Sequence, residues 1–206
     1  MQLLNYQTIN ILVLYHQGKA DEAIREYFRN QVEPQLDASK TGHVYELPLQ
    51  EIEHIRQNME QLQKYVEEKH INLVVAAKFN AFLALALPAE VKKLVICPIV
   101  DPHADGKLNL AMRVLTDYNY MRSLRRIVCG YITILRKRNT YAIFIRGRVG
   151  IERQQDIFVK KYGHKNISNW MDFACLTPRG MKTEQVAEYD YRRALEQNFA
   201  KIISIF

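Results

Sequence analysis

The residues of this chain that could do chemistry together are mostly cations. Lys78 lies between two apolar runs in "VVAAKFNAFLAL", a pattern that predicts a buried strand, a sharp turn and a buried helix. Arg146 and Arg148 follow a later strand-like run, and Arg179 follows the last one. In an open α/β sheet, ligands bind beyond the carboxyl ends of the strands. Because ammonium and guanidinium groups bind phosphate and carboxylate, these residues predict an anion-binding pocket.

The distribution of charge agrees with an anionic ligand or partner. The net charge is +7, but residues 1–100 carry 10 basic and 12 acidic side chains, whereas residues 101–206 carry 19 basic and 10 acidic ones. Between Tyr118 and Ile151 there are eight Arg or Lys residues and no acid. This asymmetry favours an anionic partner on the C-terminal half. The alternative is a solvated basic face, which charge alone does not exclude.

Few residues near Lys78 could act in nucleophilic catalysis. Acyl transfer needs a nucleophile within reach of a base that a third group orients, and a lysine among arginines has neither. A neutral Lys78 amine could form a Schiff base with a carbonyl compound, but no acid or base has a clear role beside it. His103 is the best candidate base. His16 ends the first predicted strand, where it either lines a ligand loop or makes a structural hydrogen bond. We assign no catalytic residue.

The sequence contains no clear motif for binding a metal or a cofactor. Cys97, Cys129 and Cys175 stand far apart without a CxxC pair, which predicts reduced thiols in a cytoplasmic protein and no zinc site. Asp101 and Asp105 could hold a metal or supply a relocated acid, but loop acids more often form turns or caps. The first residues lack the basic region and cleavage site of a signal peptide. We therefore expect no metal, no cofactor and no membrane association.

The elements that must position these residues alternate between strands and helices. Near-continuous apolar runs predict strands buried on both faces of a parallel sheet. Helical spacing separates them, so we expect βαβ units in a three-layer α/β sandwich. The mostly parallel sheet has six strands, with the predicted spatial order 2-1-3-4-5-6. The predicted strands are 9–16, 43–49, 71–78, 93–100, 140–147 and 170–177, and the predicted helices are 20–37, 49–69, 79–90 and 183–203.

One connection is longer than the others. Residues 101–139 are mostly helical by pattern and form a short lid between the fourth and fifth strands. The chain shows no internal repeat or Pro/Gly/Ser-rich linker, so residues 1–206 are expected to form a single domain. The helix after Lys78 is expected to point its partly positive N-terminus at the same place as the cations.

The order of these features resembles the α/β-hydrolase superfamily. Its nucleophile elbow has the pattern G-x-S-x-G, and here Ala76, Lys78 and Asn80 occupy the three defined positions. The chain looks most like the small bacterial YqiA-type esterases. Matching stretches are "LVLYHQG", "YELPLQEIEHIRQNMEQLQKYVEE" and "CPIVDPH", in the family's order and over nearly the whole chain. The elbow motif is present only in degenerate form.

The resemblance implies that the catalytic triad is lost. The family's acid and histidine follow the last two strands, where this chain has "FIRGRVGIER" and "LTPRGMKTE". The resemblance thus implies a catalytically degenerate hydrolase fold. Together with the cations described above, we predict that it binds an anionic small molecule or a protein partner through Lys78, His16, Arg146, Arg148 and Arg179. The main alternative is an active esterase with a relocated nucleophile. Nucleic-acid binding through the basic lid is a minor one.

Overall fold

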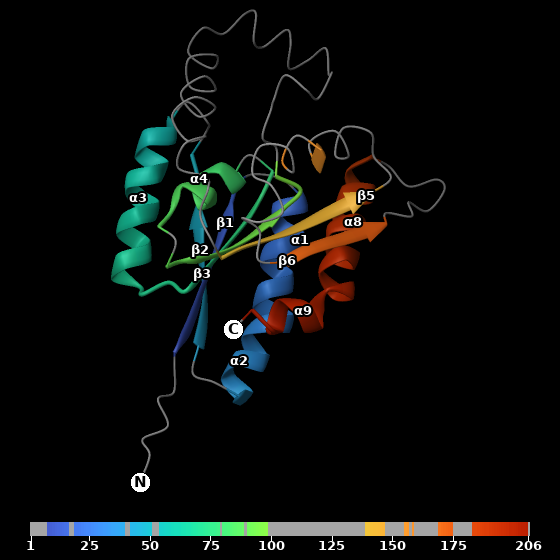
Figure 1. The fold of residues 1–206 in the computed structure, drawn as a ribbon, viewed down its shortest axis with the longest axis horizontal. Helices are drawn as coiled ribbons and strands as arrows, with labels where there is room; N and C mark the ends of the chain where they lie inside the picture. The colour runs from blue at the N-terminus through green and yellow to red at the C-terminus, as the bar shows by residue number, and fades with distance from the viewer. Residues whose placement is uncertain are drawn as a thin grey trace, which may run out of the picture.

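Six parallel strands form one sheet at the centre of the molecule (Figure 1). A computed structural model describes residues 8–16, 19–39, 42–50, 54–78, 80–88, 90–98, 139–146, 155–156, 158, 169–174 and 183–205. The order β2-β1-β3-β4-β5-β6 confirms the predicted one, and each neighbouring pair is parallel. The strands are β1 (Ile9–Tyr15), β2 (Gly42–Pro48), β3 (Leu73–Ala77), β4 (Lys92–Ile96), β5 (Thr140–Arg146) and β6 (Asn169–Ala174).

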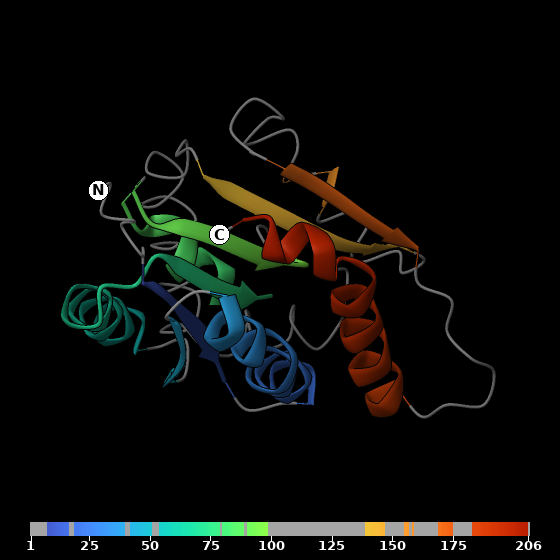
Figure 2. The ribbon, with the colours of Figure 1, turned by 90° about the horizontal axis from the view of Figure 1, so that it is seen from below.

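Helices cover both faces of this sheet, which gives the predicted three-layer sandwich. One face carries α1 (Lys19–Tyr27), the π-helix η1 (Phe28–Val32), α2 (Glu33–Ser39), α8 (Thr183–Gln197) and α9 (Phe199–Ile203). The other carries α3 (Ile55–Glu68) and α4 (Asn80–Ala86). Figure 2 shows α1 and α8 together on their side of the sheet. The two apolar clusters explain why β1 and β3 are near-continuous apolar runs, since residues of both strands enter both clusters.

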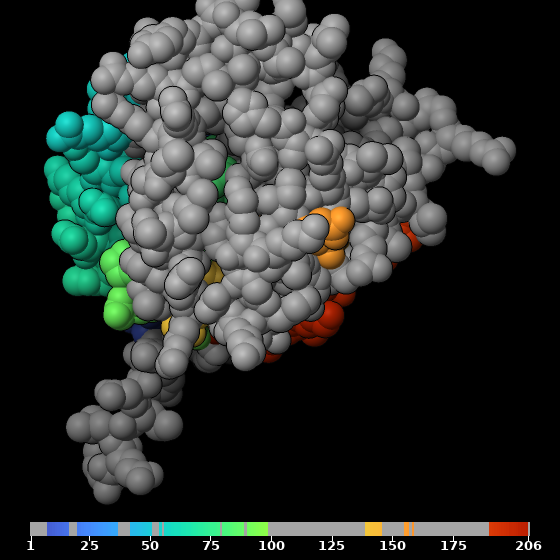
Figure 3. Space-filling model, turned by 45° about the horizontal axis from the view of Figure 1, so that its top comes forward, coloured from blue at the N-terminus to red at the C-terminus, as the bar shows by residue number. Residues whose placement is uncertain are grey.

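The helix α3 separates its apolar and polar sides as its spacing predicts. Met59 and Leu62 are buried against the sheet. On the outer side, Arg56 pairs with Glu60, and Lys64 approaches Glu68, each at the four-residue spacing of one helix face. Figure 3 shows α3 as a continuous flank of the molecule. These exposed pairs contribute little to stability, so the apolar side holds α3 in place.

Two predicted helices differ from the observed ones. The helix predicted over 20–37 is divided by the π-helix η1, whose wider turn keeps Phe28 and Val32 buried. The helix predicted over 79–90 ends at Ala86, because Pro88 disfavours helical backbone in the residue before it. α4 begins at Asn80, shortly after Lys78, and the contribution of its N-terminus to anion binding stays a prediction.

The predicted lid over 101–139 lies outside the described residues, apart from Asn139. Whether the chain is a single domain therefore stays a prediction. None of the helices in the described part of the chain is long and apolar enough to cross a membrane.

A fully buried lysine anchors the start of β4. Lys93 is 0% exposed, and its ammonium donates hydrogen bonds to the carbonyl oxygens of Pro88 and Val91, both at 2.7 Å. Lys93 N–H also donates to the carbonyl of Asn139 at the start of β5. A buried ammonium is tolerated only when its hydrogen bonds are made. Lys93 therefore holds the turn after α4 against the sheet.

Replacing Lys93 by methionine should lower the free energy of unfolding by about 2–5 kcal/mol. The apolar side chain leaves two buried carbonyls without donors, and each such loss costs about 1–3 kcal/mol. Denaturant unfolding measures the change. The control is K64M on the exposed side of α3, which should change stability by less than about 1 kcal/mol. Equal losses in the two variants would contradict the structural role of Lys93.

Candidate functional site

The turn after β3 has a strained backbone at Lys78. β3 ends at Ala77, Lys78 has φ 51°, and α4 begins at Asn80. The Lys78 N–H donates to the carbonyl of Ile96 at the end of β4, at 3.1 Å. A residue other than glycine adopts this left-handed conformation at a cost of about 1–2 kcal/mol. The turn therefore directs the Lys78 side chain away from the sheet, and this side chain is exposed.

Small buried residues allow this turn. Ala76, Ala77 and Ala81 are each 1% exposed, so the strand and the following helix approach closely. Larger side chains at these positions would separate β3 from α4. The sharp turn predicted over 76–80 from its small residues is thus present around Lys78.

A buried carboxylate from another helix lies beside the turn. Asp21 is in the first turn of α1 and is only 7% exposed. Its Oδ2 accepts a hydrogen bond from the backbone N–H of His16 at 2.8 Å and a longer one from Asn80 Nδ2 at 3.5 Å. The carboxylate thus connects the loop after β1 with the start of α4.

Burial raises the pKa of the Asp21 carboxyl, because desolvation disfavours the charged form. The hydrogen bond from the His16 N–H opposes this change, as do the positive charges of Lys78 and His16. Desolvation is the larger effect, so the folded chain holds this proton more tightly than an ordinary aspartic acid does. The groups around Asp21 therefore do not fully offset the desolvation of its carboxylate.

An aromatic ring forms the third side of the site. The Lys78 ammonium lies 5.6 Å from the centroid of the Tyr191 ring on α8, which is within the range of a cation–π contact. Among the side chains that the structure describes, no carboxylate lies within 4.0 Å of this ammonium. Lys78 thus stands over an aromatic face, near Asp21 but without a direct ion pair. We call His16, Asp21, Lys78, Asn80 and Tyr191 the Lys78 site.

Contacts between α1 and α8 fix Asp21 relative to Tyr191. The buried Tyr27 hydroxyl of α1 donates to the carbonyl of Leu195 in α8 at 3.0 Å. On the surface, Arg192 of α8 pairs with Glu26 of α1 at 2.8 Å. The buried hydrogen bond carries more of the free energy, because an exposed ion pair contributes little.

Ion pairs with the edge strand β2 hold the C-terminal part of α1 and the following η1. Arg25 donates two hydrogen bonds to Glu46 Oε2 of β2, and its guanidinium also lies 4.1 Å from the centroid of the Tyr15 ring. Arg29 pairs with the same carboxylate through Oε1 at 2.7 Å. Because α1 is anchored here, its N-terminal turn keeps Asp21 at the end of β1.

Only part of the predicted site lies in the described structure. Lys78 and His16 are both within reach of Asp21, and β5 ends at Arg146. His103, Arg148 and Arg179 lie outside the described residues, so their convergence on Lys78 stays a prediction. Residues 101 and 105, the candidate metal ligands, also lie outside them. Within the described part of the chain, no three His, Cys, Asp or Glu residues cluster as metal ligands.

Sequence reasoning missed Asp21 and Tyr191. An acid in the first turn of a helix is ordinarily explained by the helix dipole, and Tyr191 shares the apolar spacing of its helix. The one available signal was the position of Asp21 shortly after the first strand, at the carboxyl edge of the sheet. Cys97, predicted to be core, is 4% exposed, and its sulfur accepts the Ile145 N–H at 3.4 Å.

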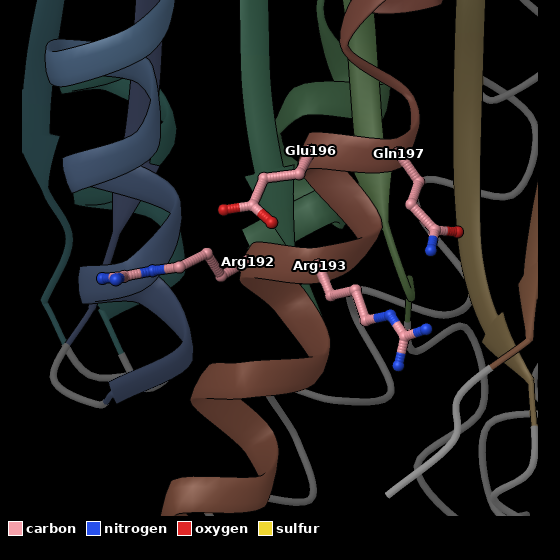
Figure 4. Close-up of a pocket in the computed structure, with 4 residues that line it drawn as sticks. All are labelled: Arg192, Arg193, Glu196 and Gln197. Atoms are coloured by element: carbon pink, nitrogen blue, oxygen red, sulfur yellow. The ribbon is translucent and has the colours of Figure 1, made fainter.

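A separate hollow of about 500 Å³ lies along α8. Arg192, Arg193, Glu196 and Gln197 line it. Figure 4 shows Arg192 and Glu196 pointing toward α1, with Arg193 and Gln197 on the other side of the helix. Because Glu26 neutralises Arg192 and Glu196 adds a negative charge, this hollow is a weaker candidate for anions than the Lys78 site.

An esterase and a lipase homologue are among the solved structures that are similar to this chain. Neither a protein-family model nor a curated protein matches this chain. Esterase B from Lactobacillus rhamnosis aligns over 99% of the chain and 77% of its own, with 11% identity and a TM-score of 0.58. The hormone-sensitive lipase homologue EstE7 from a metagenome library aligns over 94% and 79%, with 9% identity and a TM-score of 0.52. The chain has an α/β-hydrolase fold.

Glycine at position 78 should relieve the strain of the turn. We expect K78G to leave the free energy of unfolding unchanged or raise it by up to about 1 kcal/mol, since glycine adopts positive φ freely. In contrast, K64G within α3 should lose about 1 kcal/mol of stability. Equal losses in the two variants, measured by denaturant unfolding, would contradict the strained turn.

Removing the Asp21 charge should change how stability depends on pH. Because its folded-state pKa is raised above 3.8, the free energy of unfolding falls as the pH rises from there through the folded value. D21N removes this effect and keeps an oxygen for the His16 N–H. The stability of D21N relative to wild type should therefore increase over that range and then level off.

Thermal unfolding across a pH series measures this difference. D156N, at an exposed position, controls for the loss of one negative charge from the chain. A D21N advantage that shrinks as the pH rises would contradict the raised pKa.

Proposed function

We propose that this chain is a catalytically degenerate α/β-hydrolase-fold protein that binds an anionic small molecule, or an acidic group of a protein partner, at the Lys78 site. The observation that carries the proposal is the position of Lys78. Its exposed ammonium stands on a strained turn at the carboxyl edge of the sheet, the part of the fold where ligands bind. In the family that the sequence resembles, this position carries the nucleophile.

The strain itself supports a binding role. Conformations that cost free energy persist where the surrounding structure enforces them, and they cluster at functional sites. A solvated lysine on a relaxed turn would not need positive φ. Since Lys78 has no described ion pair within 4.0 Å, its charge is available to an incoming anion.

The surroundings support binding rather than acyl transfer. A protonated amine is not a nucleophile. Asp21 Oδ2 accepts hydrogen bonds from His16 and Asn80, and it orients no described imidazole toward the turn. The site thus offers a fixed positive charge, as anion recognition requires.

Calorimetric titration with phosphate, sulfate and acetate tests the proposal. Wild type should bind at least one of these anions, and K78Q should weaken that binding by about tenfold or more. The matched control is K64Q, which removes an exposed lysine far from the turn and should bind as wild type does. Equal binding by wild type and K78Q would reject Lys78 as the anion ligand.

A working esterase is the second candidate, because the structural neighbours of this fold are esterases. It would need a nucleophile away from Lys78. A fluorophosphonate probe and a panel of short-chain esters separate the two candidates. Labelling of a serine, or turnover that survives in K78Q, would replace the binding proposal by catalysis.

A further inference from the structure

Asp21 has a free acceptor inside the Lys78 site. Both of its described hydrogen bonds use Oδ2, and the bond from Asn80 is long at 3.5 Å. Its other oxygen, Oδ1, takes no hydrogen bond from the described residues. Asp21 is 7% exposed, and Oδ1 is not among the fully buried polar atoms, so a donor from outside the chain can reach it.

The opposite charges of the site attract one another but do not close an ion pair. The field of Lys78 reaches Asp21, yet no described carboxylate oxygen lies within 4.0 Å of the ammonium. Lys78 lies instead over the Tyr191 ring at 5.6 Å. The hydrogen bond between Tyr27 and Leu195 keeps α1 and α8, and therefore Asp21 and Tyr191, in this arrangement.

A simple anion would interact favourably with Lys78 but not with Asp21. Its charge would be attracted by Lys78 and repelled by Asp21, so Asp21 would weaken the binding of a simple anion without abolishing it. A ligand that also carries a cationic donor would turn the repulsion into a second attraction. Charge-assisted hydrogen bonds of this kind are stronger than neutral ones.

We propose that the ligand of the Lys78 site is zwitterionic, with a carboxylate or phosphate that binds Lys78 and an ammonium group that binds Asp21. This inference rests on the proposed function and adds a specificity-determining residue to it. Amino acids, amino-carboxylates with a longer spacer and phosphoethanolamine belong to this class. The buried Tyr191 ring, which is 4% exposed, supports the Lys78 ammonium from the side of α8.

Matched ligand pairs test the inference by calorimetry at mildly alkaline pH. Glycine, β-alanine and γ-aminobutyrate are compared with acetate, propionate and butyrate, and phosphoethanolamine is compared with ethyl phosphate. In at least one pair, the zwitterion should bind wild type about tenfold more tightly than its partner without the ammonium. D21N, which keeps an oxygen for the His16 N–H, should reduce that preference to about twofold or less.

Two further variants complete the design. K78Q should weaken binding of both members of the pair, and D156N, which removes an exposed carboxylate, should retain the preference of wild type. Circular dichroism and thermal unfolding show whether D21N is folded. A folded D21N with the full preference would overturn the role of Asp21.

The outcomes separate this inference from the proposed function. If wild type binds simple anions as tightly as zwitterions and K78Q weakens both, the anion site stands and the zwitterion inference fails. If no member of any pair binds wild type, both fail. A preference for the zwitterion that D21N abolishes, together with weaker binding of both ligands to K78Q, would support both.

Discussion

The buried carboxylate of Asp21 is the constraint on which the arrangement of this site depends. It accepts the His16 N–H at the end of β1 and approaches Asn80 at the start of α4. These two segments follow neighbouring strands, so one side chain sets the distance between their loops. The interaction is made despite the desolvation that raises the pKa of Asp21. The fold thus retains an unfavourable buried charge beside its only described exposed cation at this turn.

A second unfavourable feature stands next to the first. Lys78 adopts positive φ, although glycine would do so without strain. Two destabilising features side by side are hard to explain by stability alone, since most of the sheet is held by apolar burial on both faces. They have a common explanation if the turn must hold an amine and a carboxylate apart in a fixed geometry. Under the proposed function, stability is lost at this turn in exchange for a binding surface.

Much of the fold could be predicted from the sequence because it depends on local patterns. Leu73–Ala77 is apolar throughout and Ile9–Tyr15 is interrupted only by Asn10, a pattern typical of parallel strands covered on both faces. Lys78 could be found for the same reason, since it ends such a run. The π-helix could not, because Phe28 and Val32 have a spacing that also suits an α-helix. Asp21 and Asn80 are 59 positions apart, and no local pattern reports that contact.

The fold by itself does not determine the reaction, because the interactions that hold it do not depend on the residue at the turn. The strand order, the sharp turn and the two helical layers are held by apolar contacts and backbone hydrogen bonds, none of which requires a nucleophile. A chain can therefore exchange the group on the turn and keep the α/β-hydrolase fold at about a tenth of sequence identity. At the carboxyl edge of this sheet, an ammonium lies over an aromatic ring with a carboxylate nearby. Under the function proposed above, that edge recognises charge rather than cleaving an ester.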